Sequence, residues 1–96
     1  MNIEILEPAQ HELDGAIDYY NCQRKGLGDE FLLEALAAFD RICEFPEAWP
    51  RLSKRTRRCR TRRFPYGITY QPGENCCTIV AIAHLHRDPV RWEDLS

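Results

Sequence analysis

The chain has 96 residues, of which 44% are hydrophobic and 29% are charged, and its formal net charge is -2. This length suits one compact domain, and the composition supports a hydrophobic core under a polar surface. No stretch approaches the roughly 20 apolar residues of a membrane-spanning helix, and the first residues lack the pattern of a secretory signal. We therefore expect a single cytoplasmic domain over residues 1–96, with no membrane segment.

The small net charge hides a strong polarity along the chain. Residues 1–50 carry 11 acidic and 3 basic side chains, whereas residues 51–96 carry 4 acidic and 10 basic side chains. Most of the positive charge lies between Arg51 and Arg63, a segment without any acid. Such a concentration indicates a surface for nucleic acid or for an acidic protein. The alternative is a solvated strand whose cations pair with acids elsewhere in the domain.

The cysteines do not follow the spacing of a disulfide framework or of a zinc site. Their number is odd, and the adjacent pair at the start of a strand points to opposite faces. We expect free thiols and no bound metal at these positions: Cys22, Cys43, Cys59, Cys76 and Cys77.

The first half of the chain predicts one strand and two helices. Residues 2–6 alternate between polar and apolar side chains, which is typical of a short strand. A helix is expected from about Pro8 to just before Gly26, because apolar residues recur there at helical spacing. A second helix from about Gly28 to Phe45 has the same spacing, and the proline after Phe45 ends it. The short link makes the two helices an antiparallel hairpin.

The second half of the chain predicts three strands, at residues 57–64, 66–71 and 78–84. The turn at 72–75 joins the last two as a hairpin, and the last strand is apolar on both faces, as in the centre of a sheet. The order β-α-α-β-β-β indicates an α+β fold with two layers. We expect the helix hairpin to pack on a mostly antiparallel, four-stranded sheet.

The first of these three strands carries the basic run. Alternation places Arg58, Arg60 and Arg62 on one face, which would be the open side of the sheet. Guanidinium groups are always charged and match the geometry of phosphates and carboxylates. Arg57 and Arg63 share the opposite face, which favours a structural role over binding for these two residues.

A second group of polar residues follows the end of the last strand. Histidine exchanges a proton near neutral pH, arginine can hold a phosphate, and side chains at a strand end can reach a cleft. The alternative for each histidine is a structural role at the end of the sheet. Tyr66, beside the arginines, is a candidate to stack on a nucleic-acid base. The residues of the group are His84, His86, Arg87, Arg91 and Trp92.

Four motifs follow one another along the chain: Phe45-Pro-x-x-Trp49-Pro50, Arg57-Arg58, Phe64-Pro65-Tyr66-Gly-Ile68-x-Tyr70 and Ile79-Val-Ala-Ile-Ala-His84-x-x-Arg87-Asp88-Pro89-x-x-Trp92. Together they resemble the RelE/ParE superfamily of bacterial type II toxins. The N-terminal strand and the helix hairpin fit the same pattern, so the resemblance covers nearly the whole chain. The fold that it implies agrees with the β-α-α-β-β-β order.

The resemblance implies a toxin that is neutralised by a small antitoxin encoded beside it. Such antitoxins wrap the toxin with an acidic segment that becomes ordered on binding. The residues expected to bind the antitoxin or the target are Arg57, Arg58, Arg60, Arg62, Tyr66, Arg91 and Trp92.

The resemblance also implies one of two mechanisms. ParE-like members bind and poison DNA gyrase without catalytic residues of their own, and the ending H-x-x-R-D-P-x-x-W looks more like this branch. RelE-like members cut messenger RNA in the ribosome without a metal, and in that alternative His84, His86 and Arg87 would be catalytic. A degenerate toxin that only retains the fold and a binding surface is a third possibility. No cofactor is expected in any of these cases.

Overall fold

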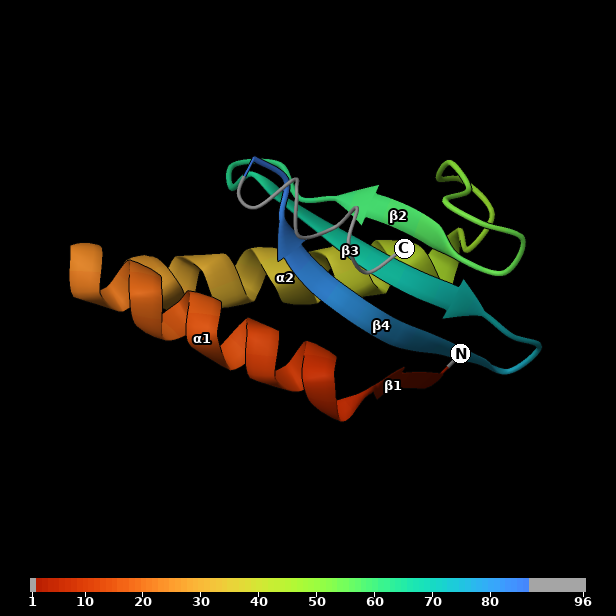
Figure 1. Cartoon of the computed structure of the whole chain (residues 1–96), viewed down its shortest axis with the longest axis horizontal. Helices are drawn as coiled ribbons and strands as arrows, with labels where there is room; N and C mark the ends of the chain where they lie inside the picture. The colour runs from red at the N-terminus through yellow and green to blue at the C-terminus, as the bar shows by residue number, and fades with distance from the viewer. Residues whose placement is uncertain (1, 87–96) are drawn as a thin grey trace.

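The structure is a computed structural model that describes residues 2–86. The described elements confirm the order that the sequence predicts, and Figure 1 looks onto the sheet with α2 behind it. Neither of the two helices in this part of the chain is long and apolar enough to cross a membrane. The elements are β1 (Asn2–Ile5), α1 (Glu7–Gln23), α2 (Leu27–Glu44), β2 (Arg57–Arg60), β3 (Tyr66–Pro72) and β4 (Cys76–His84).

The four strands form one mixed sheet in the order β1-β4-β3-β2. β1 pairs with β4 in parallel. Parallel pairing needs a long connection, and the helix hairpin that follows β1 in the sequence supplies it. The pairs β3–β4 and β2–β3 are antiparallel. β4 therefore has a strand on each side, which confirms the central position that its apolar composition predicts.

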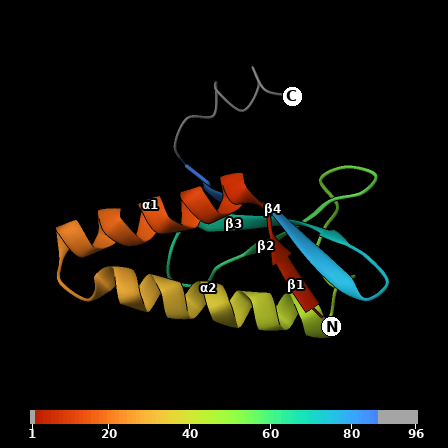
Figure 2. The ribbon, with the colours of Figure 1, turned by 90° about the horizontal axis from the view of Figure 1, so that it is seen from below.

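The two helices form the predicted antiparallel hairpin, and its turn projects beyond the sheet (Figures 1 and 2). Gly26 ends the connection in a left-handed conformation with φ of 88°, which a residue without a Cβ adopts at little cost. Gly28 allows the helices to approach closely, because a Cβ there would lie 2.1 Å from the carbonyl oxygen of Ile17. The Gly28 N–H also donates to the side chain of Asn21 at 2.7 Å.

The core lies between the helix hairpin and one face of the sheet. Its centre is a cluster of aromatic rings in which Phe31 lies 4.8 Å from Tyr66 and 5.2 Å from Phe64, centroid to centroid. Burial of such rings supplies a large part of the stability of a small domain. The largest fully buried side chains of the described residues are Phe31, Ile42, Cys59, Ile68, Tyr70, Cys77, Ile79 and Ile82.

All five cysteines are free, as the sequence predicts. Cys59 and Cys77 are fully buried, and burial raises the pKa of both thiols, which keeps them protonated. These two residues act as small apolar side chains of the core. Within residues 2–86 no three His, Cys, Asp or Glu side chains form a group that could hold a metal ion.

β2 is shorter than the strand predicted at residues 57–64, because the chain turns away after Arg60. The hydroxyl of Thr61 donates to the carbonyl oxygen of Phe64, which closes the turn. The Glu34 carboxylate on α2 accepts the backbone N–H groups of Arg63, at 3.0 Å to each oxygen, and of Phe64, at 3.2 Å. These contacts replace the strand pairing that would have continued the alternation.

Glu34→Ala is expected to lower the free energy of unfolding by about 1–3 kcal/mol, because the turn loses a charged acceptor for two backbone donors. Chemical denaturation followed by circular dichroism measures this change. Asp40→Ala, at an exposed position of the same helix, is the matched control and should change stability by less than about 0.5 kcal/mol. Equal stability of the two variants would show that α2 does not hold the turn through Glu34.

Candidate binding surface

The face of the sheet that points away from the helices carries part of the basic run. Cys59 is fully buried against the core, so its neighbours Arg58 and Arg60 point to the opposite, open face. Arg58 pairs across the strands with Thr69 of β3, and Arg60 pairs with Gly67. The structure thus confirms two of the three arginines that the alternation places on this face.

Two residues of the predicted surface lie elsewhere. Arg62 is exposed in the turn between β2 and β3, because β2 ends before it. Tyr66 is only 5% exposed, and its ring lies 6.1 Å from the ring of Tyr20, centroid to centroid, in the core. The expectation that Tyr66 stacks on a nucleic-acid base is therefore corrected: the even spacing from Ile68 and Tyr70 puts it on the buried face of β3.

The loop between α2 and β2 is held against the sheet by two side chains. The Tyr70 hydroxyl donates to the carbonyl oxygen of Pro46 at 2.5 Å. The Arg57 Nη1 donates to the carbonyl oxygens of Trp49, at 2.7 Å, and Glu47, at 3.2 Å. Arg57 thus has the structural contacts that its position in the strand predicts, and it fixes the part of the loop that precedes the basic residues.

Arg63 is also engaged within the domain. Its Nη1 lies 2.9 Å from a carboxylate oxygen of Glu30 on α2, and Arg24 lies 3.3 Å from the other oxygen. The hydrogen bond from Arg63 lowers the pKa of the Glu30 carboxyl, although this carboxyl group is solvated. These contacts tie the turn after β2 to the helix layer and leave Arg63 with a structural role.

Among residues 2–86, the other basic residues of the loop and of β2 have no such partner. In the part of the chain that the structure describes, none of them forms an ion pair with an acid. Their charges are therefore available to an anionic partner. The residues are Arg51, Lys54, Arg55, Arg58 and Arg60.

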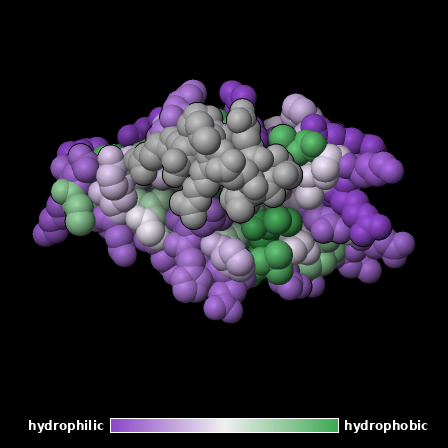
Figure 3. All heavy atoms as spheres, in the orientation of Figure 1, coloured by the Kyte–Doolittle hydropathy of each residue, from purple (hydrophilic) through white to green (hydrophobic). Residues whose placement is uncertain are grey.

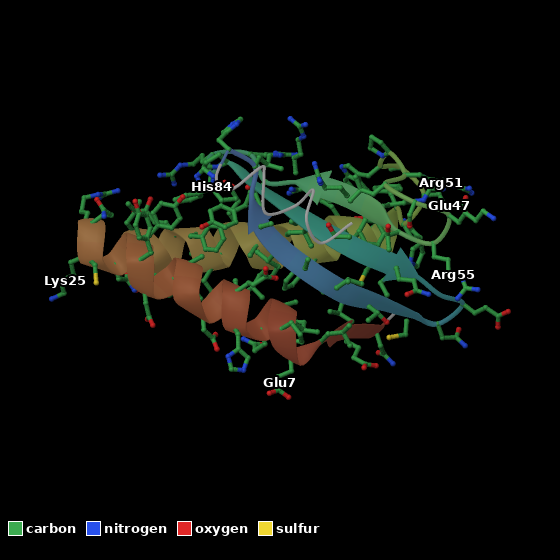
Figure 4. All side chains as sticks on the ribbon, in the orientation of Figure 1. Glu7, Lys25, Glu47, Arg51, Arg55 and His84 are labelled. Atoms are coloured by element: carbon green, nitrogen blue, oxygen red, sulfur yellow. The ribbon has the colours of Figure 1, made fainter. Side chains whose placement is uncertain are left out.

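Two hollows adjoin these cations, each of about 430 Å³. The loop-end hollow lies between the loop and the β3–β4 turn, where Figure 4 labels Glu47, Arg51 and Arg55, and it mixes cations with two acids. The β2 hollow is lined by an apolar group from the loop and by two arginines from the strand. The described residues that line it are Trp49, Pro50, Leu52, Arg58 and Arg60. The sequence does not single out Leu52 as a site residue, because it is one apolar residue in a basic segment without periodic spacing.

His84 does not share a face with the arginines of β2. His84 pairs directly with the buried Tyr66, and their ring centroids lie 5.2 Å apart, so His84 is on the side of the sheet that faces the helices. β4 ends at His84, and the exposed ring of His86 lies 6.0 Å from that of His84. The structure therefore brings the two histidines together but separates His84 from Arg58 and Arg60 by the thickness of the sheet.

A backbone contact determines the tautomer of His84. Its Nδ1 accepts the backbone N–H of His86 at 3.1 Å, so the neutral ring carries its proton on Nε2. The remaining predicted residues of the C-terminal group, Arg87, Arg91 and Trp92, lie outside the described residues.

Comparison with known proteins identifies one family. The sequence profile described as "ParE toxin of type II toxin-antitoxin system, parDE" matches residues 3–89. A solved structure described as a chromosomal ParDE TA system from P. aeruginosa has a similar fold, with a TM-score of 0.63 and 18% sequence identity. That similarity covers 90% of this chain and 97% of the other. No curated protein sequence matches the chain.

The hydrogen bond from the Tyr70 hydroxyl to the loop predicts that the folded protein loses stability at alkaline pH. Burial raises the pKa of Tyr70 to about 12, against the opposing effect of the nearby Arg57 guanidinium. The folded protein thus keeps this proton to a higher pH than the unfolded chain, which releases it near pH 10. The stabilisation is complete below about pH 10 and is lost as the pH rises toward about 12.

Denaturation of the wild type and of Tyr70→Phe at roughly pH 9 and roughly pH 11.5 tests this expectation. The wild type should lose more unfolding free energy between the two conditions than Tyr70→Phe does, because the variant has no phenol to titrate. Identical losses would show that the Tyr70 hydroxyl is no more protonated in the folded protein than in the unfolded chain.

Proposed function

Because this chain belongs to the ParE toxin family of type II toxin–antitoxin systems, we propose that it stops bacterial growth by binding DNA gyrase and trapping it on cleaved DNA. In this proposal the chain is a binding protein with no catalytic residue. Its functional surface is the open, basic face of β2 together with the loop that precedes it.

The observation that carries this choice is the separation of His84 from Arg58 and Arg60. Cleavage of RNA by its own 2'-hydroxyl needs a general base, a general acid and cations around one phosphate. His84 faces the helix layer beside Tyr66, whereas Arg58 and Arg60 point from the opposite face. One phosphate in contact with these two arginines would not reach the His84 ring, so this geometry supports a binding function over a ribonuclease function.

The partner expected from the family is a cognate antitoxin. Cations that lack acidic partners among residues 2–86 favour a ligand with carboxylates in a row, and such a segment would cover the surface that the target needs. We therefore place antitoxin and gyrase on overlapping parts of the same surface. Binding that depends on these exposed charges should weaken as salt is added.

Purified protein should inhibit the supercoiling activity of gyrase and should increase the amount of cleaved DNA that gyrase holds. Added antitoxin should reverse both effects, because it covers the same surface. In parallel, ribosome-bound messenger RNA should remain intact in the presence of the protein. A lack of any effect on gyrase at micromolar concentration would contradict the proposal, and cleavage of the messenger RNA would establish the RelE-like alternative instead.

A further inference from the structure

We propose that the β2 hollow, lined by Trp49, Pro50, Leu52, Arg58 and Arg60, is the docking site for one acidic peptide segment that carries a large apolar side chain. The apolar side chain enters the hollow, and carboxylates on either side of it pair with Arg58 and Arg60. This proposal rests on the proposed function, because the segment belongs to the antitoxin. It specifies which part of the surface binds the apolar side chain of the antitoxin and which residues bind its carboxylates.

The walls of the hollow combine two chemistries. Trp49 packs partly against the core, and Leu52 is 47% exposed, so an apolar surface lies open to solvent beside the two guanidinium groups. Apolar patches within hydrophilic surroundings also appear on this face of the molecule in Figure 3. Removing the Leu52 side chain from water favours an apolar ligand group. A volume of about 430 Å³ accommodates one large side chain.

The aliphatic stem of Arg58 lies across Gly67 of β3. A Cβ at Gly67 would lie 2.8 Å from the Arg58 Cδ and 2.9 Å from the Leu85 Cδ2. The missing side chain at Gly67 thus leaves the room in which the stem of Arg58 lies against β3. An arginine that is already ordered loses less conformational entropy when a carboxylate binds.

The free edge of β2 is partly occupied by the preceding loop, so a bound peptide is recognised through its side chains and does not add a strand to the sheet. The Arg58 N–H donates to the carbonyl oxygen of Pro50 at 3.1 Å, and Arg51 forms a backbone bridge with Arg57. The loop therefore occupies much of the edge that an incoming strand would use. A nucleic-acid backbone would pair with the arginines but would leave Trp49 and Leu52 uncovered, so a peptide fits the hollow better.

The direct test is the affinity of the full chain for a labelled peptide that spans the acidic tail of the antitoxin encoded beside it. Leu52→Ser and Arg60→Ala should each weaken binding by about tenfold or more. Leu33→Ser on the exposed face of α2 and Lys25→Ala at the tip of the hairpin are matched controls, and each should change affinity by less than about twofold.

A second pair of variants tests the role of Gly67. Gly67→Ala should displace Arg58 and weaken binding as much as Arg58→Ala does, and the double variant should be no weaker than either single variant. Gly15→Ala is the matched control, because nothing lies within 4 Å of its Cβ position, and it should leave affinity unchanged. Circular dichroism establishes that each variant is folded.

The outcomes separate this proposal from the function on which it rests. If wild-type protein binds the peptide and the Leu52 and Arg60 variants bind it equally well, the hollow is not the docking site, although the toxin assignment stands. If the wild type does not bind the complete antitoxin, the proposed function and this proposal are both overturned. If the variants lose affinity for a short DNA duplex but keep affinity for the peptide, the hollow is a nucleic-acid site.

Discussion

The contact between the sheet and the loop between α2 and β2 determines what this surface can do. Tyr70 and Arg57 donate to three carbonyl oxygens of the loop, at Pro46, Glu47 and Trp49. Without these donors, a segment of mostly exposed residues would have little to order it. With them, Trp49 is placed beside the arginines of β2, and apolar and cationic groups form one surface. Because Arg57 makes these contacts within the domain, its role is structural.

The charge polarity of the sequence corresponds to two layers of the molecule. The acids of residues 1–50 lie mostly on the helix hairpin, where two of them, Glu30 and Glu34, hold the turn that follows β2. The basic residues of the run 51–63 divide into two classes: Arg57 and Arg63 stabilise the loop and the turn, and the others form no ion pair with an acid among residues 2–86. The net charge of -2 therefore reports neither the strength nor the position of the binding surface.

The fold could be predicted because local signals agreed with the tertiary packing. Helical spacing, the break at Gly26 and the apolar run of β4 all indicate the same two-layer arrangement, and the structure confirms them. The end of β2 could not be predicted, because it depends on contacts with Glu34, which lies about thirty residues away in the sequence. An error in the end of a strand also misplaces the residues beyond that end, because side chains alternate between the two faces only while the strand continues.

The functional site was predicted less completely for a related reason. The basic run and the pair of histidines are visible in the sequence, but their relative placement depends on the register between β3 and β4. This register contains an irregularity at Thr69/Tyr70 and pairs His84 with the buried Tyr66. Leu52 gave no periodic signal, because it lies in a loop.

The most direct measurement of the central claim is bacterial growth during expression of the chain alone, in a comparison of charge-reversed and histidine variants. We expect that the double variant Arg58→Glu/Arg60→Glu no longer arrests growth, although it accumulates as folded protein. We also expect that His84→Ala arrests growth as the wild type does. Arrest that is lost in His84→Ala and retained in the charge-reversed variant would contradict the account and would indicate catalysis at the end of β4.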